Sequence, residues 1–299
     1  MTIERFDQTL PHGISLSCRA SGPHDAAQRV VLLHGFPEGA FVWDEVMQLV
    51  DDTARCVAPN LRGYERSTAP IEAEAYRAKH LVADIAALIE ALGAPIDLLV
   101  AHDWGGAVAW NLAAQRPHLI RQLLIINSPH PVTFLRELRD SPVQQAASAY
   151  MNFLCRPDAA ALLAENDFER LWALFTKAGG AAWLSDSLCA QYRAMWQHGL
   201  DGPLNYYRAS PMKPPLSAAD AIHTLVFLPE FVTVRVPTTV LWGEADTAFA
   251  LAVLDGLEAY VERLDVQRVV GASHWIVHEQ PARVAGTIER LLTRPRSGP

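Results

Sequence analysis

Three side chains of the kind that carry out nucleophilic catalysis follow apolar runs in this chain. Asp103, Asp246 and His274 each stand a few residues after a short segment that is typical of a buried strand. The carboxyl ends of parallel strands lie at one edge of a sheet, where ligands bind. A carboxylate beside a histidine orients the imidazole so that it can accept a proton. The order of these three residues along the chain therefore predicts Asp103 as nucleophile, Asp246 as orienting acid and His274 as base.

Each of these residues also has a simpler interpretation. His274 could be a buried histidine with satisfied hydrogen bonds, and Asp246 could be a turn residue. Three such residues in this order at three predicted strand ends are difficult to explain by chance. His278 is a second candidate for the base, but it falls at the expected start of the last helix, so His274 is preferred.

The residues around Asp103 have two interpretations. In Ala101-His102-Asp103-Trp104-Gly105-Gly106, small residues flank the carboxylate where an apolar run meets a stretch with helical periodicity. This spacing is typical of the sharp strand-to-helix turn that exposes a nucleophile. Asp is also a favoured N-cap residue, and on this stretch alone capping explains Asp103 equally well. The positions of Asp246 and His274 favour the nucleophile.

A carboxylate nucleophile restricts the chemistry. Asp103 has no proton to lose, so it can attack a saturated carbon without a base and form an alkyl ester. His274 is then needed only in the second half of the reaction, when it takes a proton from the water that attacks the ester. Direct attack on an amide or ester would give a labile anhydride, which disfavours those substrates.

Strand-like and helix-like stretches alternate at both ends of the chain, and the middle is different. Residues 132–225 have a helical pattern throughout, with scattered aromatic and Met residues and Pro or Gly at the joints. We expect an α/β core domain at 1–131 and 226–299, with a parallel sheet flanked by helices, and a helical cap at 132–225. The predicted strands are 12–20, 30–33, 54–58, 98–101, 123–126, 238–242 and 266–270, and the clearest predicted helices are 76–92 and 280–293.

The composition limits the class of protein. The chain has 299 residues, 50% of them hydrophobic and 19% charged, with a net charge of −8. This is typical of a soluble globular protein and argues against nucleic acid or an anionic membrane as partner. The four cysteines show no metal-binding spacing, and the N-terminal segment lacks the features of a signal peptide. We expect buried free thiols and a cytoplasmic location.

Several segments resemble the signatures of epoxide hydrolases with the α/β-hydrolase fold, and the resemblance extends over nearly the whole chain. It implies a mostly parallel sheet flanked by helices, with a helical cap inserted after the sixth strand. It also implies an oxyanion hole made by the backbone N–H groups of Phe36 and Trp104, and a cis Phe36–Pro37 bond. The segments are His34-Gly35-Phe36-Pro37-Glu38, Arg62-Gly63-Tyr64, residues 101–106 and Gly271-Ala272-Ser273-His274-Trp275.

The same resemblance supplies an acid for the leaving oxygen. Tyr207, in Gly202-Pro203-Leu204-Asn205-Tyr206-Tyr207-Arg208, and Tyr150, in Ser148-Ala149-Tyr150-Met151, are similar in context to the paired cap tyrosines of epoxide hydrolases. Those phenols protonate the opening ring oxygen. Packing of the lid is the alternative role for either side chain.

The expected function is hydrolysis of a small apolar epoxide to a vicinal diol, with water as co-substrate and no metal or organic cofactor. A haloalkane or haloacetate dehalogenase is the alternative. It is disfavoured because Phe36 stands where haloalkane dehalogenases usually have a polar residue, and Trp104 where haloacetate dehalogenases tend to have Arg. A binding protein without activity is a third hypothesis, against which the intact triad argues.

Two positions depart from the family pattern. Ala101 stands where the nucleophile turn more often has Gly, a change that a tight turn should tolerate. Glu65 also stands where Gly is more usual, and the sequence assigns it no role. The oligomeric state is left open, a homodimer included.

Overall fold

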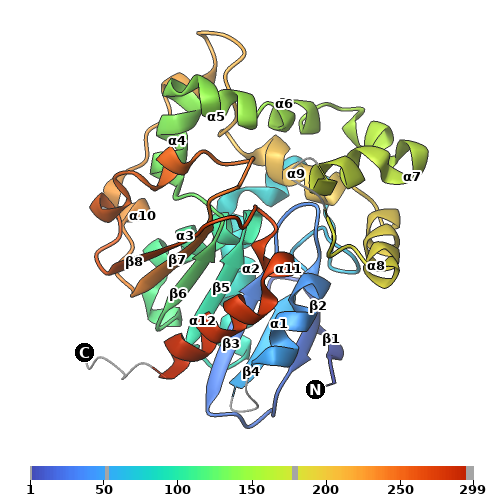
Figure 1. Cartoon of the computed structure of the whole chain (residues 1–299), viewed down its shortest axis with the longest axis vertical. Coiled ribbons are helices and arrows are strands. Elements are labelled where there is room, and N and C mark those ends of the chain that lie inside the picture. Colours follow the sequence, from blue (N-terminus) through green and yellow to red (C-terminus); the bar gives the residue numbers. More distant parts are fainter. Residues whose placement is uncertain (1, 51–53, 177–180, 294–299) are drawn as a thin grey trace.

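An eight-stranded sheet runs through the centre of the molecule in this computed structural model (Figure 1), which describes residues 2–50, 54–176 and 181–293. The strand order is β1-β2-β4-β3-β5-β6-β7-β8. The β1–β2 and β2–β4 pairs are antiparallel and all the others are parallel. The strands are β1 Glu4–Thr9, β2 Ser15–Ser21, β3 Gln28–Leu33, β4 Ala54–Pro59, β5 Leu98–His102, β6 Leu123–Ile126, β7 Thr238–Gly243 and β8 Leu264–Val269.

The central strands are apolar because helices cover both faces of the sheet. Every residue of β5 is buried, and Val100 pairs with Leu32 of β3 on one side and with Leu124 of β6 on the other. The helices α1 (Asp44–Leu49) and α12 (Pro281–Thr293) cover the near face in Figure 1, and α2 (Ala78–Ala91) and α3 (Trp104–Gln115) lie behind it. The end of β5 is thus in the middle of the carboxyl edge of the sheet.

A group of helices between β6 and β7 lies over that carboxyl edge, at the top of Figure 1. It follows the sixth strand, as the resemblance implies. The α7 helix is kinked, because residues 165–168 have non-helical backbone angles. The helices are α4 Pro131–Asp140, α5 Pro142–Ala147, α6 Tyr150–Leu154, α7 Ala159–Thr176, α8 Asp186–Gln197 and α9 Asp201–Ala209.

Two sequence-based expectations about elements are wrong, and one strand has no counterpart in the predicted elements. That strand is β1, an edge strand with polar residues on both faces and no apolar pattern. The predicted helical pattern up to residue 225 stops at Ala209, and no helix occurs before the short turn at Ala221–His223. Prolines between these points remove backbone donors and disfavour helix. His278 belongs to a separate helix, α11 (Ile276–Glu279), rather than to the last one.

The structure tests the expectation of buried free thiols and the presence of a membrane-spanning helix. Cys18 and Cys56 are buried free thiols, and burial raises the pKa of each to about 12. Cys155 and Cys189 are also free but only partly buried, contrary to expectation. Within the described ranges, no helix has the length and apolar character needed to cross a bilayer.

Candidate active site

The turn between β5 and α3 holds Asp103 in a strained conformation. Its φ is +50° and its ψ is −120°, outside the regions that non-glycine residues prefer. A Cβ on Gly105 would lie 2.5 Å from the carbonyl oxygen of Leu33, so the turn is possible only because this residue has no side chain. The hydroxyl of Ser128 donates to the Asp103 carbonyl oxygen at 2.7 Å and fixes the turn from the end of β6.

The carboxylate of Asp103 does not cap helix α3. The residue occupies the N-cap position, but its side chain accepts no hydrogen bond from the first turn. Instead, Oδ1 accepts a hydrogen bond from the backbone N–H of Phe36 at 2.7 Å. The capping interpretation of Asp103 is therefore wrong.

The turn after β3 approaches Asp103 closely. A Cβ on Gly35 would lie 2.2 Å from Asp103 Oδ1, so glycine is required there. The Phe36–Pro37 peptide bond is cis, as the resemblance implies. The N–H of Trp104 is the first of helix α3 and has no acceptor within the helix. The Phe36 N–H thus binds Asp103 Oδ1, and the N–H of Trp104 directly follows Asp103 in the chain.

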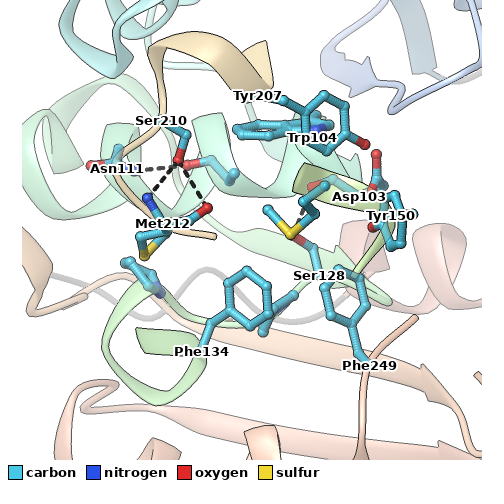
Figure 2. Close-up of a pocket in the computed structure, with 14 residues that line it drawn as sticks. Asp103, Trp104, Asn111, Ser128, Phe134, Tyr150, Tyr207, Ser210, Met212 and Phe249 are labelled. Atoms are coloured by element: carbon cyan, nitrogen blue, oxygen red, sulfur yellow. Dashed lines mark hydrogen bonds between the residues drawn. The ribbon is translucent and has the colours of Figure 1, made fainter. Parts of the chain in front are cut away.

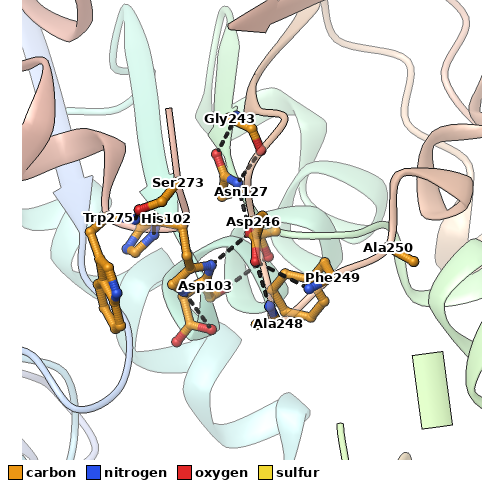
Figure 3. A network of polar contacts seen from close by, with 12 residues as sticks. His102, Asp103, Asn127, Gly243, Asp246, Ala248, Phe249, Ala250, Ser273 and Trp275 are labelled. Atoms are coloured by element: carbon orange, nitrogen blue, oxygen red, sulfur yellow. Dashed lines mark hydrogen bonds and ion pairs between the residues drawn. The ribbon is translucent and has the colours of Figure 1, made fainter. Parts of the chain in front are cut away.

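His274 follows β8, and Asp246, in the loop after β7, lies near Asp103 (Figure 3). The Nδ1 atom of His274 lies 2.8 Å from Oδ2 of Asp246, and its Nε2 atom lies 3.8 Å from Oδ2 of Asp103. The side chains of His274 and Asp103 are only 6% and 8% exposed, so the facing charges are shielded from water. The three predicted residues therefore lie together, with His274 between Asp246 and Asp103.

Asp246 is held by groups that the sequence analysis did not identify. Its Oδ1 accepts hydrogen bonds from the N–H groups of Ala248 (2.7 Å) and Phe249 (3.1 Å). The side-chain amide of Asn127 donates to Oδ2 at 2.7 Å. Asn127 directly follows β6, so the strand-end argument that selected Asp246 could have found it as well.

The electrostatics favour a charged pair at His274 and Asp246. Burial opposes the charged imidazole, but the negative charge and hydrogen bond of Asp246, followed by the charge of Asp103, raise the pKa of His274 to about 9. Burial also opposes the Asp246 carboxylate, but the charge of His274 and the hydrogen bonds outweigh it and lower the pKa. Loss of the Asp103 charge would lower the pKa of His274, although the larger contributions from Asp246 would remain.

A second polar network lies behind His274. Glu38 is fully buried, and its Oε1 accepts hydrogen bonds from Tyr192 (2.8 Å) and from His278 Nε2 (2.7 Å). The ring of His102 lies 3.3 Å from Glu38 Oε2 and donates through Nε2 to the carbonyl oxygen of His274 at 2.9 Å. His278 thus binds Glu38 and not Asp103. In the sequence, the only sign of this network is that Glu38 and His102 lie within the motifs at residues 34–38 and 101–106.

Tyr207 and Tyr150, from α9 and α6, lie near Asp103 at one cavity (Figure 2). The ring of Tyr207 packs edge-on against Phe36 and Trp104, with centroids 5.2 Å and 5.1 Å away, and the ring of Tyr150 is 6.2 Å from it. Burial raises the pKa of both phenols well above its usual value, and the nearby Asp103 charge adds to this. Both phenols therefore stay protonated. Tyr206 points elsewhere, because its hydroxyl binds the carbonyl oxygen of Arg62.

Cavities open on both sides of Asp103, and Tyr150 and Tyr207 line both of them. One holds about 420 Å³ and reaches past His274 and Trp275. The other holds about 60 Å³, is lined mainly by apolar side chains such as Phe134, and leads along α3 toward a chamber of about 490 Å³. A molecule at Asp103 thus has space in two directions. In the described part of the chain, no cluster of three or more His, Cys, Asp or Glu side chains could hold a metal ion.

The sheet, the strained turn and the cap place the chain in the α/β-hydrolase class, and a family model described as alpha/beta hydrolase fold matches residues 28–281. The chain is 34% identical to the AB hydrolase superfamily protein YfhM of Bacillus subtilis, over 94% of this chain and 95% of that one. It is 33% identical to epoxide hydrolase 4 of Mus musculus, over 88% of this chain and 72% of that one.

A solved structure gives the same result. The epoxide hydrolase of Bacillus megaterium in complex with an inhibitor superimposes with a TM-score of 0.87 and 31% identity, covering 97% of this chain and all of that one. The chain therefore belongs to the epoxide hydrolase family of the α/β-hydrolase fold, which confirms the resemblance drawn from its motifs.

Proposed function

We propose that this protein hydrolyses a small apolar epoxide to a vicinal diol in two steps, through an ester on Asp103. The observation that carries the proposal is the arrangement around the nucleophile. Asp103 faces a histidine paired with a carboxylate on one side. On the other side it faces two protonated phenols across an apolar cavity. In this account, residues 132–225 are the cap that supplies those phenols.

In the first step, Asp103 Oδ2 attacks one epoxide carbon, and the bond from that carbon to the ring oxygen breaks. The hydrogen bond from Phe36 to Oδ1 leaves Oδ2 as the attacking atom. An alkoxide is a poor leaving group, so Tyr207, assisted by Tyr150, donates a proton to the ring oxygen as it opens. Because burial raises both pKa values, each phenol carries a proton before the reaction begins.

In the second step, His274 takes a proton from a water molecule that attacks the Asp103 carbonyl carbon. The oxyanion that forms is stabilised by the N–H groups of Phe36 and Trp104. Esterification removes the Asp103 charge, which is one of the groups that raise the pKa of His274. The pKa of His274 therefore falls after the first step, which favours loss of its proton when a base is needed. The proton that His274 gives up before it acts as base passes through solvent to the tyrosinate left by the first step. The tetrahedral species then collapses, the departing alkoxide takes the proton of the hydroxyl that water supplied, and the diol leaves behind the Asp103 carboxylate and the His274 imidazolium.

A product assay tests the proposal directly. The purified protein is incubated with aryl and alkyl epoxides, and separately with haloalkanes and haloacetate, and diol and halide are measured. We expect diol from the epoxides. Halide release without diol would support the dehalogenase alternative, and no turnover by a folded protein would leave only the binding hypothesis.

Because the four thiols are free, we also propose the cytoplasm, a reducing compartment, as the location of this protein.

A further inference from the structure

Glu65 has a backbone conformation that favours glycine. Its φ is +49°, in the left-handed region, and it is one of the few non-glycine residues with a positive φ in the described part of the chain. A residue with a long side chain is strained there, so a compensating contact is expected. The partly buried carboxylate of Glu65 provides it: Oε2 accepts hydrogen bonds from the side chains of Asn60 and of Ser17, the latter at 3.2 Å.

These contacts fix the orientation of the Asn60 side chain. Asn60 is buried, and its amide donates through Nδ2 to Glu65 and to Ser17 Oγ at 2.9 Å. A carboxylate can only accept hydrogen bonds, so it selects the NH₂ end of the amide. The carbonyl end then faces the other way, where Oδ1 accepts a hydrogen bond from the backbone N–H of Ala40 at 2.8 Å.

Ala40 begins the short helical turn that follows the Phe36 loop. That turn, Ala40–Trp43, continues directly into α1, and its N-cap residue, Gly39, has no side chain with which to cap it. Asn60 supplies the missing acceptor from the loop after β4. The segment that contains the Phe36 N–H is thus anchored at Glu38 by His278 and at Ala40 by Asn60.

We propose that Glu65 is a positioning residue for the oxyanion hole, acting through Asn60 on the backbone that carries the Phe36 N–H. The proposal rests on the proposed function, because the oxyanion hole acts on the Asp103 ester. Negative charge develops on Oδ1 during ester hydrolysis, and Phe36 N–H lies 2.7 Å from that atom. A small displacement of this donor therefore slows hydrolysis of the ester more than its formation.

The test measures both half-reactions in Glu65→Gly by rapid mixing with an epoxide. Glycine relieves the backbone strain and removes the carboxylate. We expect ester hydrolysis to slow by about tenfold, less than the loss of a whole oxyanion donor, while ester formation changes by less than about twofold. Glu65→Gln keeps an oxygen that can accept from Asn60 and should restore most of the rate. Asn166→Gly, at an exposed cap residue with φ +50°, is the matched control for relief of strain and should change neither step.

Two results would overturn the proposal. One is equal slowing of both steps in Glu65→Gly together with a lower melting temperature, which would indicate general destabilisation. The other is that Glu65→Gly and Asn60→Ala have additive effects on the rate of ester hydrolysis. If both residues act through one route, the second change should slow this step little further. Hydrogen exchange at the Ala40 amide distinguishes failure of the Glu65 proposal from failure of the proposed function. It should accelerate in Glu65→Gly whether or not the wild-type protein turns over an epoxide, and unchanged exchange would contradict the Asn60 route.

Discussion

The sheet and the cap position their proposed catalytic groups by different means. Asp103, Asp246 and His274 follow strands, and each is held by hydrogen bonds from backbone or neighbouring polar groups. Tyr207 and Tyr150 stand on cap helices and are placed by edge-on ring packing. The sheet side is charged and coupled, whereas the cap side is neutral and surrounded by apolar groups. We infer that the sheet fixes the ester chemistry and the cap determines which leaving group is accepted.

Loss of the nucleophile should have the largest effect on the sheet side. We expect Asp103→Ala to reduce turnover by about 10⁴-fold or more, because Asp103 is the carboxylate that lines both cavities beside the two tyrosines. Steady-state diol formation measures this, and intact-protein mass shows the absence of an alkyl adduct. Substantial activity with a normal fold would contradict the assignment of Asp103.

Loss of the base should block hydrolysis of the ester but not its formation. His274→Gln should react once and then stall, because the first step needs no base, with steady-state turnover reduced on the order of 10⁴-fold. Mass spectrometry should show one equivalent of alkyl group on Asp103. His278→Gln is the comparison, and it should still release diol, since His278 binds Glu38 and not the nucleophile. A variant at His274 that never forms the adduct would assign it a role in the first step.

Change in the cap should affect only the leaving group. We expect Tyr207→Phe to slow ester formation from an epoxide by about 10²-fold and to leave ester hydrolysis unchanged, because the phenol acts only on ring opening. Tyr206→Phe is the matched control, since that hydroxyl faces Arg62. Equal loss in both half-reactions would indicate that Tyr207 is structural and would remove the distinction between cap and sheet.

The charge coupling on the sheet side should appear in thermal stability. Folding raises the pKa of His274 from 6.5 to about 9, so its stabilising contribution is complete below pH 6.5 and is lost as pH rises through about 9. We expect the wild-type melting temperature to fall by several degrees more over this interval than that of His274→Gln. Scanning calorimetry across the interval measures the difference, and parallel curves would contradict the raised pKa.

Much of the sheet side was predictable from the sequence, and the reason is physical. Apolar runs such as β5 are buried on both faces, and parallel strands bring their carboxyl ends together, so position along the chain translates into position in space. The same rule would have found Asn127 at the end of β6. It could not place Glu38 against His102, because that contact joins the loop after β3 to the last residue of β5 through buried polar groups that have no periodic pattern.

The cap was less predictable. Its helices were expected, but the kink in α7 and the irregular chain after Ala209 follow from packing and from prolines rather than from periodicity. The preference for Tyr207 over Tyr206 rests on a family resemblance. The two residues are adjacent in one helix, and the helical pattern does not indicate which side chain faces the cavity. The geometry now separates them, because Tyr207 lines the cavity and Tyr206 binds Arg62. The role of Tyr207 stays a prediction.

A single turnover in ¹⁸O-labelled water tests the central claim most directly. Excess enzyme is mixed with an epoxide, and the peptide that contains Asp103 is analysed by mass spectrometry alongside the diol. If water attacks the ester carbonyl, one oxygen of Asp103 acquires the label and the first diol formed carries unlabelled oxygen from the carboxylate. Label in the diol and none in Asp103 would show that water attacks the epoxide directly, and would contradict the covalent account.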